Sequence, residues 1–384
     1  MPQSVIILGG GIIGLSCAFE AARRGMLVTL IEPHGLGGQA SGAAAGMLAP
    51  YSENTEQPDD FFHLCLSSLQ SYPEWIKAVE DGSGMTAEWV QSGSVNVFMH
   101  EADVLPIQSR LDWQNRWGAE AQLIDAAQLR KLEPMIAPSA VAGVFTPKES
   151  HVYAPKLVTS LEAACRKLGV RILEHAGQIE DVLVHQSGGV SVRAQALKSL
   201  VHSDRLVVCA GAWSGAYEKW FGLSIPVHPI RGQICSFGHD AAEVRHMVFS
   251  SQAYWVGKNN GRLVCGASED VSGFETSVTE RGIGRLIRSS SRLFPFLEGR
   301  QTAHRWAGLR PATKDGQPLL GQIAGMPSVI MASGHYRNGI LLSPITALLT
   351  ADILEGKEVK PSISRFAPDR FTAAAHRGMA RALR

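Results

Sequence analysis

A glycine-rich turn close to the N-terminus constrains the fold of this chain more than any other feature. The apolar run 5–8 is followed by glycines at positions 9, 11 and 14, and an alanine-rich stretch then continues to Arg24-Gly25. A second apolar run, 27–31, ends at Glu32. This order predicts a strand, a tight turn, a helix and a second strand, which is the βαβ unit that binds a dinucleotide.

Each of the three glycines has a steric reason to be there. Gly9 allows the tight turn, Gly11 lets a pyrophosphate approach the backbone, and Gly14 brings the helix against the strand. The first N–H groups of the helix offer partial positive charge to the phosphates. Glu32 follows Gly14 by eighteen residues, close to the spacing of about 20 at which an acid accepts hydrogen bonds from an adenosine ribose. That acid would repel a 2′-phosphate.

The charge balance excludes general attraction to polyanions. The 384 residues contain 36 basic and 35 acidic side chains, for a net charge of +1. We therefore expect neither nucleic acid nor an anionic membrane surface as a partner. The length favours two domains or one elaborated α/β domain.

Cysteine and histidine usage predicts neither disulfides nor a metal site. The six cysteines lie far apart without C-x-x-C spacing, and the thirteen histidines show no metal-ligand pattern. Buried thiols in a reducing compartment are expected. The first strand begins within five residues of Met1 and leaves no room for a signal peptide, and the charge-free window 35–52 is too polar to span a membrane. We expect a cytoplasmic location.

The rest of the chain predicts a discontinuous cofactor domain. Helices are expected at 59–71, 74–80, 101–117, 125–132, 156–168, 280–294 and 340–354. Strands are expected at 89–98, 141–145, 170–174, 206–209, 226–237, 247–256, 262–267 and 329–332, with a hairpin at 179–192. The cofactor domain is predicted to comprise 1–83, 146–220 and 305–384, and the substrate domain 84–145 and 221–304. Residues 373–384 are expected to form a frayed tail.

Two segments of small residues are candidate cofactor contacts. Residues 35–50 are rich in Gly and Ala and carry no charge, as a backbone passing close under a flat ligand would require. The alternative for this segment is an Ala-rich helical turn. Residues 211–214 form a second small-residue turn after a buried strand. Because the chain contains one G-x-G-x-x-G motif, one bound dinucleotide is expected, FAD or NAD.

Four segments together resemble the D-amino-acid oxidase superfamily of FAD enzymes, most closely its glycine oxidase (ThiO) branch. They are 9–14 with Glu32, 40–48, 308–311 followed by Asp315-Gly316, and 334–340. The resemblance covers essentially the whole chain. It implies the α/β fold class, with a Rossmann-like FAD-binding domain of the glutathione-reductase/D-amino-acid-oxidase type and an inserted antiparallel-sheet substrate domain. Related sarcosine oxidases attach FAD through a C-terminal cysteine, but no cysteine follows Cys265, so noncovalent FAD is expected.

The resemblance also implies an activity. Glycine and similar small amines would be oxidised to an imine that hydrolyses to glyoxylate and ammonia, and O₂ would be reduced to H₂O₂. It further implies a role in thiamin thiazole synthesis and a homo-oligomer such as a tetramer. Two alternatives remain open. One is a D-amino-acid or secondary-amine dehydrogenase or sarcosine oxidase of the same fold, and the other is a non-catalytic or tRNA-associated FAD-binding protein.

Three residues are expected to contact the substrate. Arg310, which the sequence places after a tight turn, matches the family position that clamps the substrate carboxylate, a task suited to a bidentate guanidinium. A structural ion pair is the alternative. Tyr254 matches a tyrosine that contacts the same carboxylate, and Trp255 would face the opposite side of the strand. Arg337 matches an arginine near flavin and substrate, with an exposed loop arginine as the alternative.

Two positions depart from the family pattern. Phe249 stands where a pocket tyrosine is found, and Glu269 stands where some members have methionine, which leaves the substrate range open. No obligatory general base is identified, as expected for hydride transfer from a neutral amine. The helix that begins near Ile340 is expected to direct its N–H groups at the negative edge of reduced flavin.

The residues expected to hold FAD come from all parts of the cofactor domain. They are Gly9, Gly11, Ile12, Ile13, Gly14, Glu32, Pro33, His34, Ser41, Ala45, Gly46, Met47, Val182, Ala210, Gly211, Trp213, Arg310, His335, Arg337, Asn338, Gly339, Ile340 and Leu341.

Overall fold

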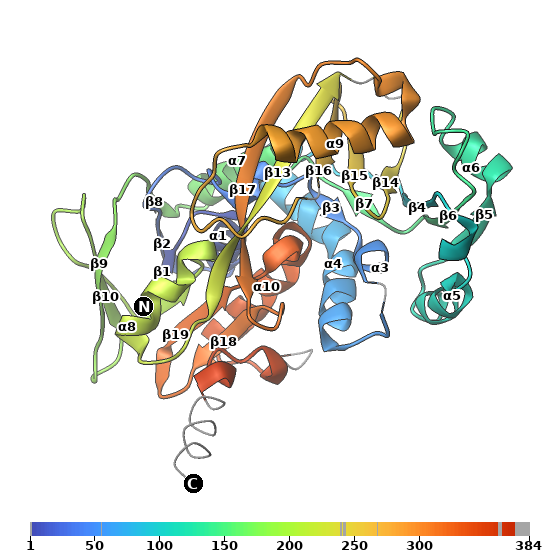
Figure 1. The fold of residues 1–384 in the computed structure, drawn as a ribbon. Helices are drawn as coiled ribbons and strands as arrows, with labels where there is room; N and C mark the ends of the chain where they lie inside the picture. The colour runs from blue at the N-terminus through green and yellow to red at the C-terminus, as the bar shows by residue number, and fades with distance from the viewer. Residues whose placement is uncertain are drawn as a thin grey trace, which may run out of the picture.

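The computed structural model describes residues 2–54, 56–238, 240, 243–266, 268–359 and 363–372. Two large sheets organise these residues (Figure 1). The predicted tail at 373–384 lies outside the described residues, so that prediction is not tested. None of the helices in the described ranges is long and apolar enough to cross a membrane.

The first sheet has the mostly parallel topology of a dinucleotide-binding core. Its strand order is β18-β19-β12-β1-β2-β8, and only the β18–β19 pair is antiparallel. The strands are β1 (Ser4–Leu8), β2 (Leu27–Ile31), β8 (Arg171–Leu173), β12 (Arg205–Val208), β18 (Leu319–Ile323) and β19 (Met326–Ser333). The predicted βαβ unit is confirmed, since β1 and β2 are parallel neighbours joined by α1 (Ile12–Arg23).

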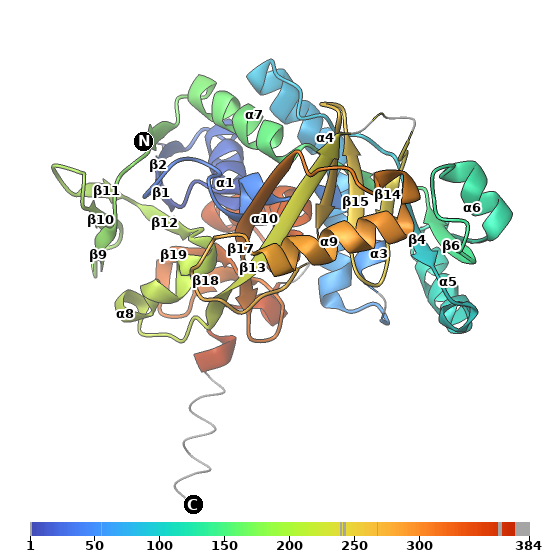
Figure 2. The ribbon, with the colours of Figure 1, turned by 45° about the horizontal axis from the view of Figure 1, so that its top comes forward.

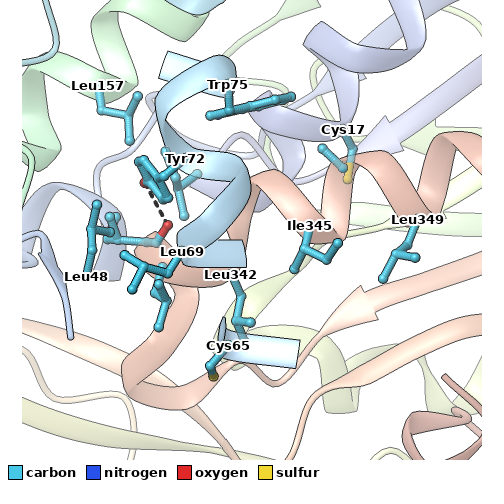
Figure 3. Packing of buried hydrophobic residues seen from close by; sticks show 14 of the residues in the cluster. Cys17, Leu48, Cys65, Leu69, Tyr72, Trp75, Leu157, Leu342, Ile345 and Leu349 are labelled. Carbon is cyan, nitrogen blue, oxygen red and sulfur yellow. Dashed lines mark hydrogen bonds between the residues drawn. The ribbon is translucent and has the colours of Figure 1, made fainter. Parts of the chain in front are cut away.

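Helices bury one face of this sheet. Helix α1 packs against α7 (Ala154–Lys167) and α10 (Gly339–Leu354), and α10 packs against α4 (Asp60–Ser83). Figure 3 shows part of the resulting core, which includes Tyr72 and Trp75 of α4 together with Leu342 and Ile345 of α10. The Tyr72 hydroxyl donates to the carbonyl of Ile340 at 2.9 Å, so a buried polar atom stays paired at the start of α10.

The second sheet has eight strands in the order β17-β13-β16-β15-β14-β4-β6-β5. All pairs are antiparallel except β14–β4. The strands are β4 (Ser94–Phe98), β5 (Gln122–Asp125), β6 (Ala142–Thr146), β13 (Val227–Gly238), β14 (Met247–Phe249), β15 (Tyr254–Lys258), β16 (Arg262–Gly266) and β17 (His304–Thr313). Helix α9 (Glu280–Leu293) lies across this sheet (Figure 2).

The remaining elements are short or lie at the edges. Two small sheets are β9 (Ile179–Val184), β10 (Val190–Ala194) and β11 (Val201–Ser203), and β3 (Met47–Leu48) with β7 (Ser150–His151). The helices are α2 (Ala40–Ala43), α3 (Pro50–Glu53), α5 (Ile107–Arg116), α6 (Ala126–Leu132), α8 (Glu218–Phe221), η1 (Glu101–Asp103), η2 (Gly211–Tyr217), η3 (Pro295–Leu297), η4 (Tyr336–Asn338) and η5 (Ser364–Phe366). The predicted hairpin at 179–192 is confirmed.

Five local predictions were wrong in whole or in part. The expected helix 101–117 is interrupted by a turn at 104–106 between η1 and α5, and the expected strand 89–98 begins only at Ser94. Helix α4 continues through Pro73 to Ser83 instead of breaking into two helices, because its buried face against α10 and α7 outweighs the one backbone hydrogen bond that proline removes. The expected strand 247–256 is split into β14 and β15 by a turn at 250–253. Arg310 follows no tight turn, since it lies inside β17, where its neighbours pair with β13.

The proposed division into two domains stays a prediction. Strands β4, β5 and β13 to β16 fall within the segments expected for the substrate domain, as does β6 except for its last residue, whereas β17 falls almost entirely in a segment expected for the cofactor domain. Strand β17 therefore belongs to the second sheet, although the sequence pattern assigns it to the cofactor domain.

Candidate active site

One cavity of about 1290 Å³ extends from the glycine-rich turn to the wall of the second sheet. It touches Gly11 after β1, Glu32 after β2, Gly211 after β12 and His335 after β19. These are the carboxyl ends of parallel strands, where ligands bind in open α/β sheets. On the opposite side it reaches Tyr254 of β15. An elongated ligand that contacts both sheets fits this shape.

The glycine-rich turn leaves no space for side chains. A Cβ atom on Gly14 would lie 1.8 Å from the carbonyl oxygen of Gly9, and one on Gly9 would lie 2.3 Å from the carbonyl oxygen of Cys209. Gly9 also has φ +105°, which favours glycine. A Cβ on Gly11 would approach the Ser41 hydroxyl to 3.2 Å. Gly11 lines the cavity, so its backbone is accessible to a phosphate group.

Ser41 has a structural partner within this turn. Its hydroxyl accepts a hydrogen bond from the N–H of Ile12 at 2.9 Å. One of the first N–H groups of α1 is thus already bonded, and helix α1 has no side-chain cap of its own. Ser41 ties the segment after β2 to the start of α1, which fixes the two walls of the phosphate site relative to each other.

Glu32 is held in place by two backbone donors. Its carboxylate accepts hydrogen bonds from the N–H of Gly10 at 2.6 Å and from the N–H of His34 at 2.8 Å. These bonds orient the carboxylate at the end of β2 and leave lone pairs available for hydroxyl donors. The arrangement suits an adenosine ribose.

Both interpretations of the small-residue segment, a helical turn and a cofactor-contacting backbone, apply to residues 40–48. It forms the helical turn α2, and it also lines the cavity with Ala43, Ala44, Ala45, Gly46 and Met47. Gly46 has φ +78°, and a Cβ there would lie 2.1 Å from the carbonyl oxygen of Val152. A Cβ on Gly308 would lie 2.6 Å from that of Ala43. Small side chains are thus needed where α2 meets β17.

The start of α10 also opens into the cavity. Gly339 and Ile340 line it, and the helix has no side-chain cap at its N-terminus, so its N–H groups can stabilise negative charge. Next to it, His335 is 2 % exposed and its Nε2 pairs with the Thr346 hydroxyl at 3.0 Å. Burial lowers the pKa of His335 to about 3. This imidazole is therefore neutral at physiological pH.

Most residues expected to contact FAD line this cavity. They are Gly9, Gly11, Ile12, Ile13, Glu32, Pro33, His34, Ser41, Ala45, Gly46, Met47, Ala210, Gly211, Trp213, Arg310, His335, Arg337, Gly339 and Ile340. Four others do not. Gly14 packs under the turn, Val182 is buried in β9 beside the wall formed by Gln178 and Ile179, and Asn338 and Leu341 flank the lining part of α10.

The substrate wall is built around Arg310 and Tyr254. Two glycines make room for them: a Cβ on Gly232 would lie 2.3 Å from Nη1 of Arg310, and one on Gly266 would lie 2.3 Å from the Tyr254 hydroxyl. Arg310 donates to the carbonyl of Ser268 at 2.8 Å and has no ion pair within the part of the chain that the structure describes. The alternative of a structural ion pair is therefore not supported.

Tyr254 faces the cavity and the next residue faces the core. Trp255 is completely buried and its Nε1 donates to the Ser290 hydroxyl at 2.9 Å, in agreement with the alternation expected of a strand. Burial raises the pKa of Tyr254 to about 12, although the charge of Arg310 opposes the shift. The hydroxyl is thus a hydrogen-bond donor throughout the physiological range.

Arg337 and Glu269 form an ion pair at 3.6 Å on the rim of the cavity. Their side chains are 45 % and 47 % exposed, so screening by solvent leaves this pair with little net stabilisation. Tyr336 lies beside them with φ +47°, and burial together with Glu269 raises its pKa to about 12. Arg337 is thus a partly exposed residue that nevertheless touches the cavity.

Sequence reasoning missed a group of polar residues on the α3 and β4 side of the cavity. Glu53, Ser52, Asn96 and Arg110 all line it. Ser52 and Asn96 are bonded to each other, and the buried Glu149 accepts from Ser52 at 2.6 Å. The one available signal was that Ser52 and Glu53 closely follow segment 40–48. Their partners are 42 to 97 residues away in the chain, which no local pattern reports.

The chain matches the family model described as FAD dependent oxidoreductase (DAO) over residues 4–353. It is 31 % identical over 365 residues to a glycine oxidase of Geobacillus kaustophilus, which covers 94 % of this chain and 95 % of that protein. It is also 33 % identical to the bifunctional protein ThiO/ThiG of a Synechocystis strain, over 96 % of this chain and 54 % of that protein.

Solved structures agree with these matches. The crystal structure of the Geobacillus kaustophilus glycine oxidase superposes with a TM-score of 0.91 at 29 % identity and covers 96 % of this chain and 99 % of its own. An iminodiacetate oxidase from Chelativorans superposes with a TM-score of 0.86 over 95 % of this chain and 98 % of its own, but at 23 % identity it supports the fold alone.

Proposed function

The chain belongs to the family of FAD-dependent oxidoreductases, and from this premise we propose that it oxidises glycine and similar small amino acids. One observation carries the proposal. Arg310 and the Tyr254 hydroxyl project from neighbouring parts of one sheet into the cavity, and glycines at 232 and 266 leave space for both side chains. A carboxylate is the ligand that a guanidinium and a phenol hydroxyl bind together. The relatives named glycine oxidase support this substrate.

The residues around the cavity fit FAD. Gly11 and the start of α1 would bind the pyrophosphate, Glu32 the ribose, and the segments 43–47 and 334–340 the flavin half. FAD supplies the acceptor for a hydride that leaves the substrate α-carbon. The partial positive charge at the start of α10 would stabilise the negative charge that the cavity gains in this step.

The contribution of the protein is to bind and orient the substrate. Arg310 holds the carboxylate through charge-assisted hydrogen bonds, and Tyr254 donates a further hydrogen bond to it. With the carboxylate fixed, the amino group and the α C–H bond of a small amino acid have few orientations left. His335 contributes no charge because it is neutral, and the described residues contain no cluster of His, Cys, Asp or Glu that could hold a metal ion.

The products follow from this chemistry. The imine would hydrolyse to glyoxylate and ammonia, O₂ would be reduced to H₂O₂, and the ThiO/ThiG relatives support a place in thiamin thiazole synthesis. Noncovalent FAD, a cytoplasmic location and a homo-oligomer complete the proposal. The six cysteines, which are buried and unpaired, support the reducing compartment.

A substrate panel on purified yellow protein tests the function. Glycine, sarcosine and small D-amino acids are mixed with the enzyme in air, and H₂O₂ is measured; a second series without O₂ follows bleaching of the flavin. We expect glycine to give both signals. Bleaching without peroxide would favour the dehydrogenase alternative, and the absence of both would overturn the proposed oxidation of glycine.

A further inference from the structure

The carboxylate of Glu53 lies on the cavity wall among the substrate-facing residues and has no task in the proposed function. Glu53 is the last residue of α3, the short helix that follows β3. Its backbone N–H bonds to the carbonyl of Ala49 at 3.0 Å, and Glu53 lines the cavity. Two residues before it, Tyr51 is anchored by Glu149, which accepts its N–H at 2.8 Å. The position of Glu53 is therefore fixed by buried contacts.

The carboxylate of Glu53 is unpaired within the described ranges. It makes no hydrogen bond and no ion pair to any of these residues, although its neighbours Tyr51 and Ser52 are fully engaged. Arg310 and Arg337 line the same cavity as Glu53, and their charges favour its ionised form. A carboxylate beside two cations and bonded to neither is free to bind a group from a ligand.

An α-amino acid brings one cationic group together with its carboxylate. If Arg310 binds the carboxylate, the ammonium lies one carbon away and needs an acceptor. Glu53 is the carboxylate that lines the cavity and is electrostatically coupled to Arg310 while keeping its own oxygens free. Glu269, the other acid in this region, is already paired with Arg337 at the rim.

We infer that Glu53 binds the ammonium group of the substrate and accepts one of its protons before the α C–H bond breaks. This inference rests on the proposed function. The N–H bond breaks, a carboxyl O–H bond forms on Glu53, and the electron pair stays on nitrogen as the lone pair of a neutral amine. That lone pair assists departure of the hydride, because it forms the C=N bond of the imine. The proton leaves Glu53 to solvent once the product has gone.

The surroundings of Glu53 suit a proton acceptor. Burial raises its pKa, and Glu269 adds to the shift while Arg337 and Arg310 oppose it. A higher pKa brings the carboxylate closer to the amine in basicity and makes the transfer less unfavourable. The titratable and charged groups that face it from the surrounding elements are Cys65 of α4, Tyr254 of β15, Glu269 after β16, Arg310 of β17 and Arg337 of η4.

The test distinguishes recognition of the substrate amine from recognition of the substrate carboxylate. Anaerobic stopped-flow mixing with glycine gives the rate of flavin bleaching as a function of pH, and titration with acetate, which lacks the amine, gives a dissociation constant from the flavin spectrum. Glu53→Gln removes the charge, Glu53→Asp retains it, and Glu56→Gln makes the same charge change at a nearby exposed position that does not line the cavity.

In Glu53→Gln the flavin should bleach about 100-fold more slowly near neutral pH, which is the usual size of a general-base contribution. Most of the rate should return at alkaline pH, where the amine of glycine is already neutral. Its affinity for acetate should be unchanged or higher. Glu53→Asp should keep the wild-type pH profile, and Glu56→Gln should match the wild type.

Two results would overturn the inference. An unchanged rate in Glu53→Gln would show that the carboxylate is not used. If Glu53→Gln bound glycine and acetate equally more weakly at every pH, and Glu53→Asp did not restore binding, Glu53 would only support the structure of the cavity wall. Failure of the wild type to bleach with glycine would instead refute the proposed function, and the inference with it.

Discussion

Individual glycines determine where the substrate-facing side chains lie. Gly232 and Gly266 pack against the ends of Arg310 and Tyr254, so the absence of a Cβ atom at each position creates the space that a functional group occupies. Neither glycine has a positive φ angle. Their role is therefore steric, and it became visible only when strands β13, β16 and β17 were placed side by side.

Substitution of Arg310 should affect substrate binding more than cofactor binding. Arg310→Ala removes the charge, and Arg310→Lys keeps the charge but loses the planar fork that binds a carboxylate. We expect KM for glycine to rise about 100-fold or more in the alanine variant and about 10-fold in the lysine variant. Steady-state kinetics measure this, and the flavin spectrum serves as the control. Unchanged KM in both variants would remove Arg310 from the site.

Gly232→Ala should reproduce part of that defect without touching Arg310 itself. The new Cβ would lie 2.3 Å from Nη1 of Arg310, so the guanidinium must move. We expect KM for glycine to rise about 10-fold. Gly238→Ala, on the same strand, meets no atom within 4 Å and is the matched control. Equal kinetics for the two variants would contradict this account of the pocket.

At the scale of elements, burial decided where helices continue. Helix α4 runs for 24 residues through Pro73, because eleven of its residues are buried and together contribute more than the roughly 3 kcal/mol that an internal proline costs. Between β14 and β15, in contrast, the chain turns where the sequence pattern predicted a continuous strand. The residues at 250–253 continue the β-like pattern but reverse the chain, and this reversal places Tyr254 opposite Phe249.

Tyr72→Phe tests the junction between α4 and α10. The substitution removes the hydrogen bond to the carbonyl of Ile340 and keeps the apolar packing. Ser343 also donates to that carbonyl, so the oxygen stays paired and the loss should be about 1 kcal/mol in the free energy of unfolding. Urea denaturation followed by circular dichroism measures it. Tyr153→Phe is the control, because it removes a hydroxyl with no hydrogen bond to any described residue and leaves the backbone hydrogen bonds of Tyr153 in place, so the free energy of unfolding should not change.

At the scale of the whole molecule, one buried carboxylate links elements of the cavity wall to the second sheet. Glu149 accepts hydrogen bonds from Ser52 of α3 and from Ser94 of β4, and it is completely buried. Burial raises its pKa to about 6, although the hydrogen bonds from the serines oppose the shift. The protonation state of this single group therefore affects the stability of the entire fold.

The sign of the pH effect follows from the raised pKa. Between the ordinary value of 4.5 and about 6 the folded protein holds this proton more tightly than the unfolded chain. The stabilisation is fully present below the ordinary pKa and is lost as pH rises through about 6, which amounts to about 2 kcal/mol. Glu149→Gln should remove this contribution. Urea unfolding of the wild type and of Glu149→Gln at several pH values between about 4 and 7 gives the change in the free energy of unfolding with pH. An identical pH dependence in the two proteins would contradict the role given to Glu149.

The sequence by itself determined the cofactor-binding core and its family. The glycine spacing, the acid after the second strand and the later motifs act through backbone geometry over a few residues, so local pattern was sufficient to predict the βαβ unit, the hairpin and most helices. The motif residues Gly9, Glu32, Met47, Arg310 and His335 indeed line one cavity.

The tertiary structure alone decided how the substrate wall is composed. Asn96, Gly232 and Gly266 carry no local signal, because each depends on residues that are distant in the chain and adjacent in space. Burial likewise fixed the continuous helix α4 and the neutral state of His335. Steric fit and desolvation are properties of the assembled core, and a linear pattern cannot report them.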